Sequence, residues 1–331
     1  MYAIGLDISA DFFTAGCVDQ QFRTIFFDKD FDQTETGWKA FIEYLFTQSI
    51  NMANCQICME STGVYSEKIS YYLYNAGFNI FVEPPNKIKQ SFYDNEKDDP
   101  LDAKQIAEFL LRYPDKKHAW QPRNEIVYQI DSLLATREQL VRLRTACKNA
   151  FKSLKRKQHR QLKLEELMTG IADDLKIKIC EIDQEMEQLI KTNPELWRTS
   201  KNILSIPNVG VMLNYNLLVI TNGYVDIRKY SSYARYFGIS PLKADSGKKK
   251  KKRKADGRGP TRMRKLLYLA AMRMKRNHPK YQKYYNRKEV EGKPGRLILQ
   301  NIENNILKLI FGVLRSGKEY MENYNSLPPD F

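Results

Sequence analysis

The chain has 331 residues and a formal net charge of +15, from 54 Lys and Arg against 39 Asp and Glu. An apolar share of 42% excludes a globally disordered protein, and the sequence has no run of 18 apolar residues that would predict a membrane span. The N-terminal sequence MYAIGLDISADFF lacks the basic start of a signal peptide. Five Cys do not suggest a disulfide framework, so we expect a reducing, cytoplasmic setting.

The charge is distributed unevenly along the chain. Residues 1–112 carry 9 basic and 17 acidic side chains, whereas residues 243–276 carry 15 basic and 2 acidic ones. An acidic segment joined to a strongly basic one predicts a polyanionic partner and a separate role for the acids.

The first third of the chain predicts an α/β domain with a mixed sheet. Short β-prone runs at 2–9, 12–18 and 22–27 follow one another closely, which indicates an antiparallel meander. After them we expect helices at 35–48 and 65–76, strands at 55–59 and 78–83, and a helix from about Pro100 to Arg112.

The rest of the chain is predicted to be mainly helical. Apolar residues at helical spacing over 124–192 indicate either an antiparallel helical hairpin or a coiled-coil dimer arm. Residues 203–220 suggest two helices joined by a tight turn, a helix-hairpin-helix in which Asn208 and Gly210 would help to bind a phosphate. A plain packing turn is the alternative. Further helices are expected at 228–237, 261–277 and 297–314, with a Lys- and Gly-rich loop at 240–260.

Four acidic residues are candidate metal ligands. Asp7 and Glu60 each end an apolar, β-prone run, and Asp99 and Asp102 are expected on one face of a helix start. Carboxylates at strand ends in an α/β sheet converge on the crevice at its rim, where they would repel one another without a cation. Mg²⁺ prefers such oxygen ligands, and metal pairs are widely used for displacement at phosphate. The alternative for each residue is an ordinary surface acid.

The candidate nucleophile is Ser246, in the segment PLKADSGKKKKKRK. Its basic surroundings would attract a phosphodiester and favour ionisation of the hydroxyl. Ser240, which precedes Pro241, is the rival candidate and fits a turn. The basic residues expected to neutralise DNA phosphates are Lys248, Lys249, Lys250, Lys251, Lys252, Arg253, Lys254, Arg258, Arg262 and Arg264.

Taken in order, these motifs resemble one known family. The sequences GLDIS, MESTGVY and KDDPLDAKQIA resemble the RuvC-like domain of the Asp-Glu-Asp-Asp (DEDD) insertion-sequence transposases. The sequences IPNVG, YFGISPLKADSGK and GRGPTRMRKLLYLAA resemble the C-terminal transposase domain of the same family. One departure is local: Asp245 precedes Ser246 and a seven-residue basic run follows Gly247, where family members often have two serines or further glycines.

This resemblance implies a fold and a division into domains. An RNase H-like (RuvC-like) domain with a mixed sheet would occupy residues 1–115. A helical coiled-coil arm would follow at residues 116–195, and a mainly α-helical transposase domain at residues 196–331.

The resemblance also implies a bacterial, bridge-RNA-guided serine recombinase. Mg²⁺, with Mn²⁺ as an alternative, would be bound by Asp7, Glu60, Asp99 and Asp102, and Ser246 would form a covalent phosphoserine with DNA. A structured noncoding guide RNA would pair with double-stranded donor and target DNA. A homo-oligomer, from dimer to tetramer, would join acids and serine from different protomers, and no membrane is expected to take part.

Two other functions are compatible with the residues. The acids could activate water in a RuvC-like, structure-selective DNA endonuclease that uses no serine. A non-catalytic nucleic-acid-binding protein is the third hypothesis, but it has no need for four acids at strand ends and a helix start.

Overall fold

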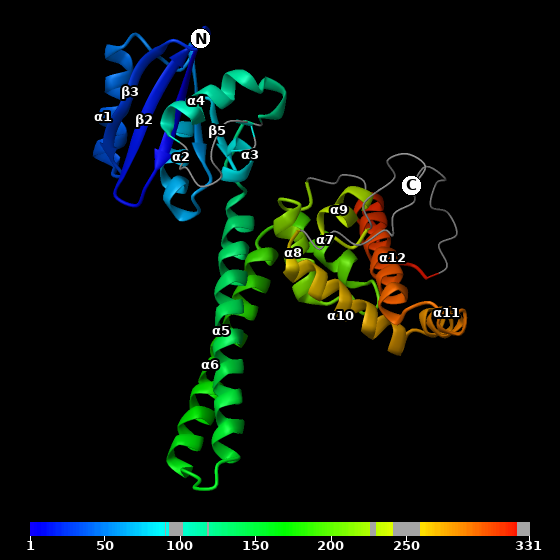
Figure 1. The fold of residues 1–331 in the computed structure, drawn as a ribbon. Helices are drawn as coiled ribbons and strands as arrows, with labels where there is room; N and C mark the ends of the chain where they lie inside the picture. The colour runs from blue at the N-terminus through cyan, green and yellow to red at the C-terminus, as the bar shows by residue number, and fades with distance from the viewer. Residues whose placement is uncertain (90, 93–101, 118, 226–229, 241–258, 323–331) are drawn as a thin grey trace. The chain divides into compact units, whose positions relative to one another are not determined.

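The computed structural model describes the chain apart from residues 90, 93–101, 118, 226–229, 241–258 and 323–331. It divides into two compact units, Met1–Pro122 and Arg123–Phe331, hereafter the N-terminal and C-terminal units. Each unit is described by itself (Figure 1).

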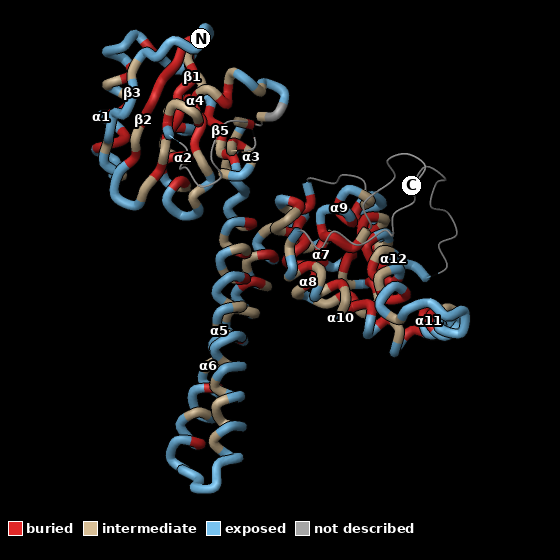
Figure 2. The backbone as a smooth tube through the Cα atoms, in the orientation of Figure 1, coloured by how far each residue is buried: buried red, intermediate tan, exposed pale blue. Residues whose placement is uncertain are grey.

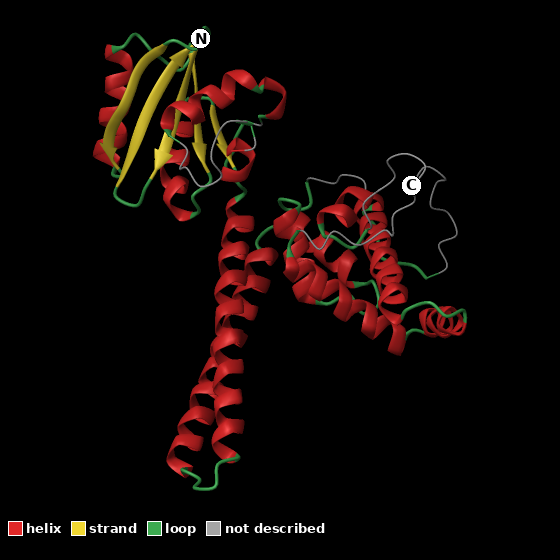
Figure 3. Ribbon diagram, viewed as in Figure 1, coloured by secondary structure: helices red, strands yellow, loops and turns green. Residues whose placement is uncertain are grey.

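The N-terminal unit is built on one five-stranded sheet (Figure 3). Its strands are β1 (Tyr2–Ile8), β2 (Phe12–Asp19), β3 (Thr24–Asp32), β4 (Cys55–Glu60) and β5 (Ile80–Glu83), in the order β3-β2-β1-β4-β5. β1, β2 and β3 form the expected antiparallel meander, and β1, β4 and β5 are parallel. The mixed sheet confirms the α/β, RNase H-like prediction for this part of the chain.

Helices cover both faces of the sheet. Alternate residues of β1, beginning with Ile4, pack against α1 (Glu35–Thr47) and α2 (Val64–Asn75) on one face. Ala3 packs on the opposite face with α4 (Ala103–Arg112) and with Ile88 of the short helix α3 (Pro85–Lys89). A single 3-10 turn, η1, spans Pro114–Lys116. The alternation of side chains along each strand therefore decides which residues face α4.

The start of α4 lies unusually close to the sheet. Gly5 of β1 pairs directly with Gly16 of β2, and Ala103 rests on this glycine pair. A Cβ on Gly5 would collide with the carbonyl oxygen of Ala103, and one on Gly16 would lie 3.1 Å from the amide nitrogen of Lys104. Only glycine at position 5 therefore allows α4 to approach β1 in this way.

The C-terminal unit begins with a long helical hairpin. Helices α5 (Glu125–Lys155) and α6 (Leu162–Lys191) run side by side and are joined by a short loop (Figure 1). Arg137 of α5 makes a two-pronged ion pair with Asp183 of α6, at 2.6 and 3.1 Å. Of the two structures expected for this segment, the hairpin forms within one chain.

The remaining helices pack around one core that includes the base of the hairpin. They are α7 (Pro194–Leu204), α8 (Val211–Ile220), α9 (Tyr230–Tyr236), α10 (Thr261–Asn277), α11 (Pro279–Val290) and α12 (Gly295–Ser316). The buried residues of this core are red in Figure 2. Helix α11 was not predicted from the sequence, and its Tyr281 and Tyr285 are buried packing residues. The mostly helical fold confirms the prediction for this region.

Helix α12 is the central helix of this core. By length and composition alone it could cross a membrane, but ten of its residues are buried against the other helices. One of them is Glu303, whose side chain is fully buried. Its carboxylate lies 3.4 Å from the exposed guanidinium of Arg296, and neither carboxylate oxygen accepts a hydrogen bond from a described residue.

Glu303 makes the stability of the C-terminal unit depend on pH. Burial raises the pKa of its carboxyl to about 7. The free energy of unfolding therefore falls as the pH rises from the pKa of the unfolded chain to about 7, and stays lower above that pH. We expect Glu303→Gln to increase the free energy of unfolding by about 3 kcal/mol at pH 8, and by far less at pH 4.5. Urea denaturation at both pH values measures this difference. The exposed Glu319→Gln is the control, and an equal gain at both pH values would contradict the prediction.

Candidate active site

A row of three acids crosses the carboxyl edge of the sheet. Leu6 pairs with Met59, so the next residues of β1 and β4 are Asp7 and Glu60, and Glu60 pairs in turn with Glu83 of β5. In each strand, the residue two positions before the acid faces α4. Side chains two positions apart lie on the same face of a sheet, so all three acids lie on the α4 face. Adjacent strands are about 4.8 Å apart, so the row brings carboxylates close together.

Helix α4 adds Asp102 to this edge. Asp102 is the N-cap residue of α4, where its Oδ1 accepts a 2.6 Å hydrogen bond from the amide of Gln105. The negative charge of Asp102 acts on Asp7 and helps to raise the pKa of the Asp7 carboxyl. Helix α4 begins at Ala103, directly after Asp102, and the expected shared face of Asp99 and Asp102 stays a prediction. Asp99 itself lies outside the described residues.

The electrostatics of the row favour a bound cation. Burial, and then the charge of Asp102, raise the pKa of Asp7. Burial, and then the charge of Asp7, raise the pKa of Glu60, while the Lys89 ammonium lowers it. Glu60 Oε1 is buried and has no hydrogen-bond partner among the described residues. A buried carboxylate oxygen without a partner is costly unless a proton or a cation satisfies it.

The residues present fit a divalent metal through their chemistry. Asp7, Glu60 and Asp102 supply only hard oxygen donors, the type that Mg²⁺ prefers. Within the described ranges, no group of three or more His, Cys, Asp or Glu side chains is already arranged around one point that could hold a metal ion. The geometry therefore identifies the edge and the donor type.

Two features of this edge were missed in the sequence. Glu83 is buried and pairs with Lys87 of α3 at 2.6 Å, which neutralises the third acid of the row. Lys89, from the same helix, acts electrostatically on Glu60. The signal was available, because Glu83 ends an apolar run just before two prolines, as Glu60 ends another.

Most of the predicted nucleophile segment cannot be placed. Ser246, the basic run Lys248–Lys254 and Arg258 lie outside the described residues. The rival, Ser240, follows α9 and its amide donates a 3.1 Å hydrogen bond to the carbonyl oxygen of Ala234. Ser240 thus occupies the turn that the sequence suggested for it.

Arg262 was expected to bind DNA phosphate, but it holds α10 against the hairpin. Its Nη2 donates a 2.9 Å hydrogen bond to the carbonyl oxygen of Leu134, and its Nη1 lies 3.5 Å from Glu138. These two partners give the half-buried guanidinium a packing role, and its contact with DNA phosphate stays a prediction. Arg264 donates a 2.9 Å hydrogen bond from Nη1 to the carbonyl oxygen of Gly259.

The two helices expected around the Pro207–Gly210 turn are α7 and α8. Asn208 adopts a left-handed conformation, with φ 63°, and its Oδ1 accepts a hydrogen bond from Asn277 of α10. Gly210 is the N-cap residue of α8 and gives that helix no side-chain cap. The guanidinium of Arg273 lies 3.9 Å from the position that a Cβ on Gly210 would occupy. The Asn208 side chain is thus a packing group, and the carbonyl oxygen of Gly210 accepts hydrogen bonds from the amides of Leu213 and Asn214.

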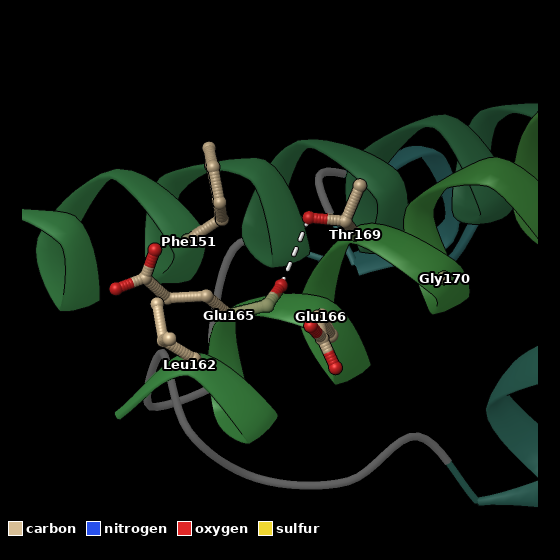
Figure 4. A pocket seen from close by; sticks show the side chains of 6 residues that line it. All are labelled: Phe151, Leu162, Glu165, Glu166, Thr169 and Gly170. Carbon is tan, nitrogen blue, oxygen red and sulfur yellow. Dashed lines mark hydrogen bonds between the residues drawn. The ribbon is translucent and has the colours of Figure 1, made fainter. Parts of the chain in front are cut away.

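One cavity of about 320 Å³ lies at the far end of the hairpin. It is lined by Phe151, Leu162, Glu165, Glu166, Thr169 and Gly170 (Figure 4). Two hydrogen bonds from Arg160 hold the Glu165 carboxylate, at 2.9 and 2.7 Å. The cavity contains none of the predicted catalytic residues.

The fold and the acid row define an RNase H-like enzyme of phosphoryl transfer. A family model described as "Transposase", for the DEDD type, matches residues 4–156, and one described as "Transposase IS116/IS110/IS902 family" matches residues 200–286. Together they cover more than two thirds of the chain. The chain therefore belongs to the IS110 family of DEDD transposases, a family that acts on DNA and uses a divalent metal.

Two relatives match nearly the whole chain, and a third matches about half of it. The chain is 24% identical to the pilin gene-inverting proteins of Moraxella lacunata and Moraxella bovis, over 96% of this chain and 97% of each relative. It is 27% identical to an uncharacterized 42 kDa protein of insertion element IS900 from Mycobacterium paratuberculosis, over 49% of this chain and 42% of that protein.

The repulsion within the acid row predicts that Asp7→Asn stabilises the protein and inactivates it. Because the pKa of Asp7 is raised on folding, its ionised form opposes folding above the ordinary Asp range, and Asn removes that cost. We expect a melting temperature a few degrees higher at pH 7 without metal, a smaller gain near pH 4, and loss of DNA strand transfer. Differential scanning calorimetry and a strand-transfer assay measure the two effects, with the exposed Asp115→Asn as control. A lower melting temperature would contradict the repulsion.

The role of Arg262 can be separated from phosphate binding. We expect Arg262→Met to lower the free energy of unfolding by about 1–2 kcal/mol, through loss of its contacts with α5. The slope of DNA affinity against salt should stay unchanged. By contrast, Arg273→Met should reduce that slope by about one without a stability cost, because Arg273 is exposed beside Gly210. If Arg262→Met reduces the salt slope as well, its assignment as a packing residue fails.

Proposed function

We propose that this protein is a site-specific DNA recombinase that excises and inserts a mobile element by RNA-guided strand exchange, through a covalent phosphoserine intermediate. The observation that carries the proposal is the acid row, in which a buried oxygen of Glu60, beside Asp7 and near Asp102, has no partner in the described part of the chain. Such a site needs a cation, and membership of the transposase family indicates a DNA phosphate as the substrate.

In the proposed site, Asp7, Glu60, Asp99 and Asp102 hold Mg²⁺, with Mn²⁺ as an alternative. The metal, when bound, stabilises negative charge on the phosphate oxygens. The protein contributes the rigid placement of the acids, with two strand ends and the N-cap of α4 fixing three of the four. The Lys87–Glu83 pair keeps the third acid of the row neutralised, so that Glu83 does not add to the negative charge at Glu60.

Ser246 is the proposed nucleophile. Its hydroxyl oxygen attacks the scissile phosphate, an Oγ–P ester forms, and the P–O bond to the leaving deoxyribose oxygen breaks. The leaving oxygen takes up a proton, and the serine hydroxyl gives one up, so the exchange is balanced. Because the ester keeps the energy of the broken bond, the strand can be rejoined to a new end without ATP.

The partners follow from the same proposal. Basic residues 248–254 and Arg258 neutralise the DNA backbone, and pairing with a structured noncoding guide RNA selects donor and target. The protein works in the bacterial cytoplasm as a homo-oligomer, dimer to tetramer, with acids and serine contributed by different protomers. The relatives named as gene-inverting proteins suggest inversion as a related outcome, because inversion and insertion differ only in how the exchanged ends are joined.

A metal-dependent nuclease without a serine nucleophile is the second candidate. It is favoured by one observation: the described acids Asp7, Glu60 and Asp102 all belong to the N-terminal unit. The two functions differ in whether the protein becomes attached to DNA.

The phosphoserine proposal predicts a covalent adduct that depends on Ser246. The full chain, with DNA, Mg²⁺ and the RNA that co-purifies with it, should form a protein–DNA species that survives denaturation. Ser246→Ala should abolish that species, whereas the rival-site control Ser240→Ala should retain it. Denaturing gel electrophoresis with labelled DNA, followed by mass spectrometry of the attached peptide, gives the readout. An adduct in Ser246→Ala would exclude this nucleophile, and cleavage without any adduct would favour the nuclease.

A further inference from the structure

Helix α2 carries four tyrosines, and one of them differs from the rest. Tyr71 and Tyr74 pack against Trp120, with ring centroids 5.1 and 5.7 Å apart, and Tyr72 packs against Trp38 at 5.3 Å. Tyr65, at the start of the helix, is 50% exposed. Within the part of the chain that the structure describes, its ring contacts no other ring or cation and its hydroxyl makes no hydrogen bond.

Tyr65 belongs to a small apolar rim at the carboxyl edge of the sheet. Its neighbour Val64 is 74% exposed, and Phe12, which begins β2, is 47% exposed. The core of the unit does not need them, because α2 buries Ile69 and Leu73 instead.

The rim is held rigidly by one side chain. Gln33 donates from its side-chain amide to the carbonyl oxygen of Tyr65 at 2.9 Å, and from its backbone amide to the carbonyl oxygen of Asp11 at 2.8 Å. Its remaining oxygen accepts a 2.8 Å hydrogen bond from Trp38. Gln33 thereby ties the start of α2 to the turn that precedes Phe12. An exposed side chain on a fixed backbone loses little entropy when it binds.

The rim is continuous with the acid row. Glu60 ends β4, the amide of Thr62 turns back to the carbonyl oxygen of Glu60 at 2.9 Å, and Gly63 adopts a positive φ of 69° before α2 begins. Tyr65 is five residues from Glu60, which limits their separation to ~17 Å. A DNA strand whose phosphate lies at the acids therefore has its nearest nucleotides within reach of Tyr65.

From this placement we propose that Tyr65, flanked by Val64, forms a stacking site for an unpaired nucleobase next to the scissile phosphate. The inference rests on the proposed function, because it requires a DNA strand at the acid row. A nucleobase suits the rim better than an apolar protein segment, because its π-face stacks on an aromatic ring while its phosphate stays at the metal-binding acids. Stacking of this kind contributes about 1–3 kcal/mol per base and tolerates any base.

The experiment removes the ring from the protein and the base from the DNA. Single-stranded oligonucleotides that carry one abasic residue, at each position around the mapped cleavage point, are bound to the full chain in Ca²⁺. Wild type should bind intact DNA about 10-fold more tightly than Tyr65→Leu, which keeps an apolar side chain at this exposed position. At one abasic position the two proteins should bind equally. Tyr65→Phe should behave as wild type, and so should Tyr74→Leu at the other end of α2.

The proposal is overturned if no abasic position removes the difference between wild type and Tyr65→Leu, or if Tyr65→Leu binds intact DNA as wild type does. Circular dichroism of each variant shows whether the fold is kept. Cleavage by Asp7→Asn on the same strand tests the proposed function separately. If Asp7→Asn still cleaves, the acid site is wrong, whatever Tyr65 does. If Asp7→Asn is inactive while Tyr65→Leu shows no coupling to a base, only the stacking site is wrong.

Discussion

The arrangement of acids at the carboxyl edge of the sheet depends on the contact between α4 and a pair of glycines. Gly5 and Gly16 face each other across β1 and β2, and together they leave a flat patch on which Ala103 rests. Because the helix lies directly on the backbone of β1, its N-cap residue arrives beside the end of the same strand. Asp7 is two residues beyond Gly5, and Asp102 is one residue before Ala103. The close approach thus converts two distant positions of the sequence into neighbouring charges.

The acid row also shows how the fold distributes an electrostatic cost. Three carboxylates on adjacent strands would repel one another strongly, and among the described residues only Glu83 of this row forms an ion pair, with Lys87. Asp7 and Glu60 are left half-buried with raised pKa values, and one oxygen of Glu60 has no partner among the same residues. A cation removes this cost, so metal affinity and instability of the metal-free site have the same origin. Natural sites of this kind give up stability for function.

The sequence predicted the strands well because their apolar runs are short and bounded by turns, and it placed Asp7 and Glu60 at strand ends because each carboxylate closes such a run. It failed where a residue's role depends on a distant partner. The contact of Arg262 with Leu134 spans 128 positions, and nothing near Arg262 in the sequence indicates it. Helix α11 was missed because its tyrosines lie among many charged residues, which weakens the apolar periodicity. Asp102 was found as an acid, but its N-cap role required the backbone.

The two units differ in what they can supply to one reaction. Among the described residues, both core clusters of the N-terminal unit are formed by residues up to Trp120, and the core of the C-terminal unit by residues from Ile126 onward. Each unit therefore has a hydrophobic core of its own. It follows that substitutions at Asp7 or Tyr65 change the N-terminal site without disturbing the fold that carries Ser246. A loss of adduct in such a variant would then report on the chemistry at the phosphate and not on the stability of the serine-bearing unit.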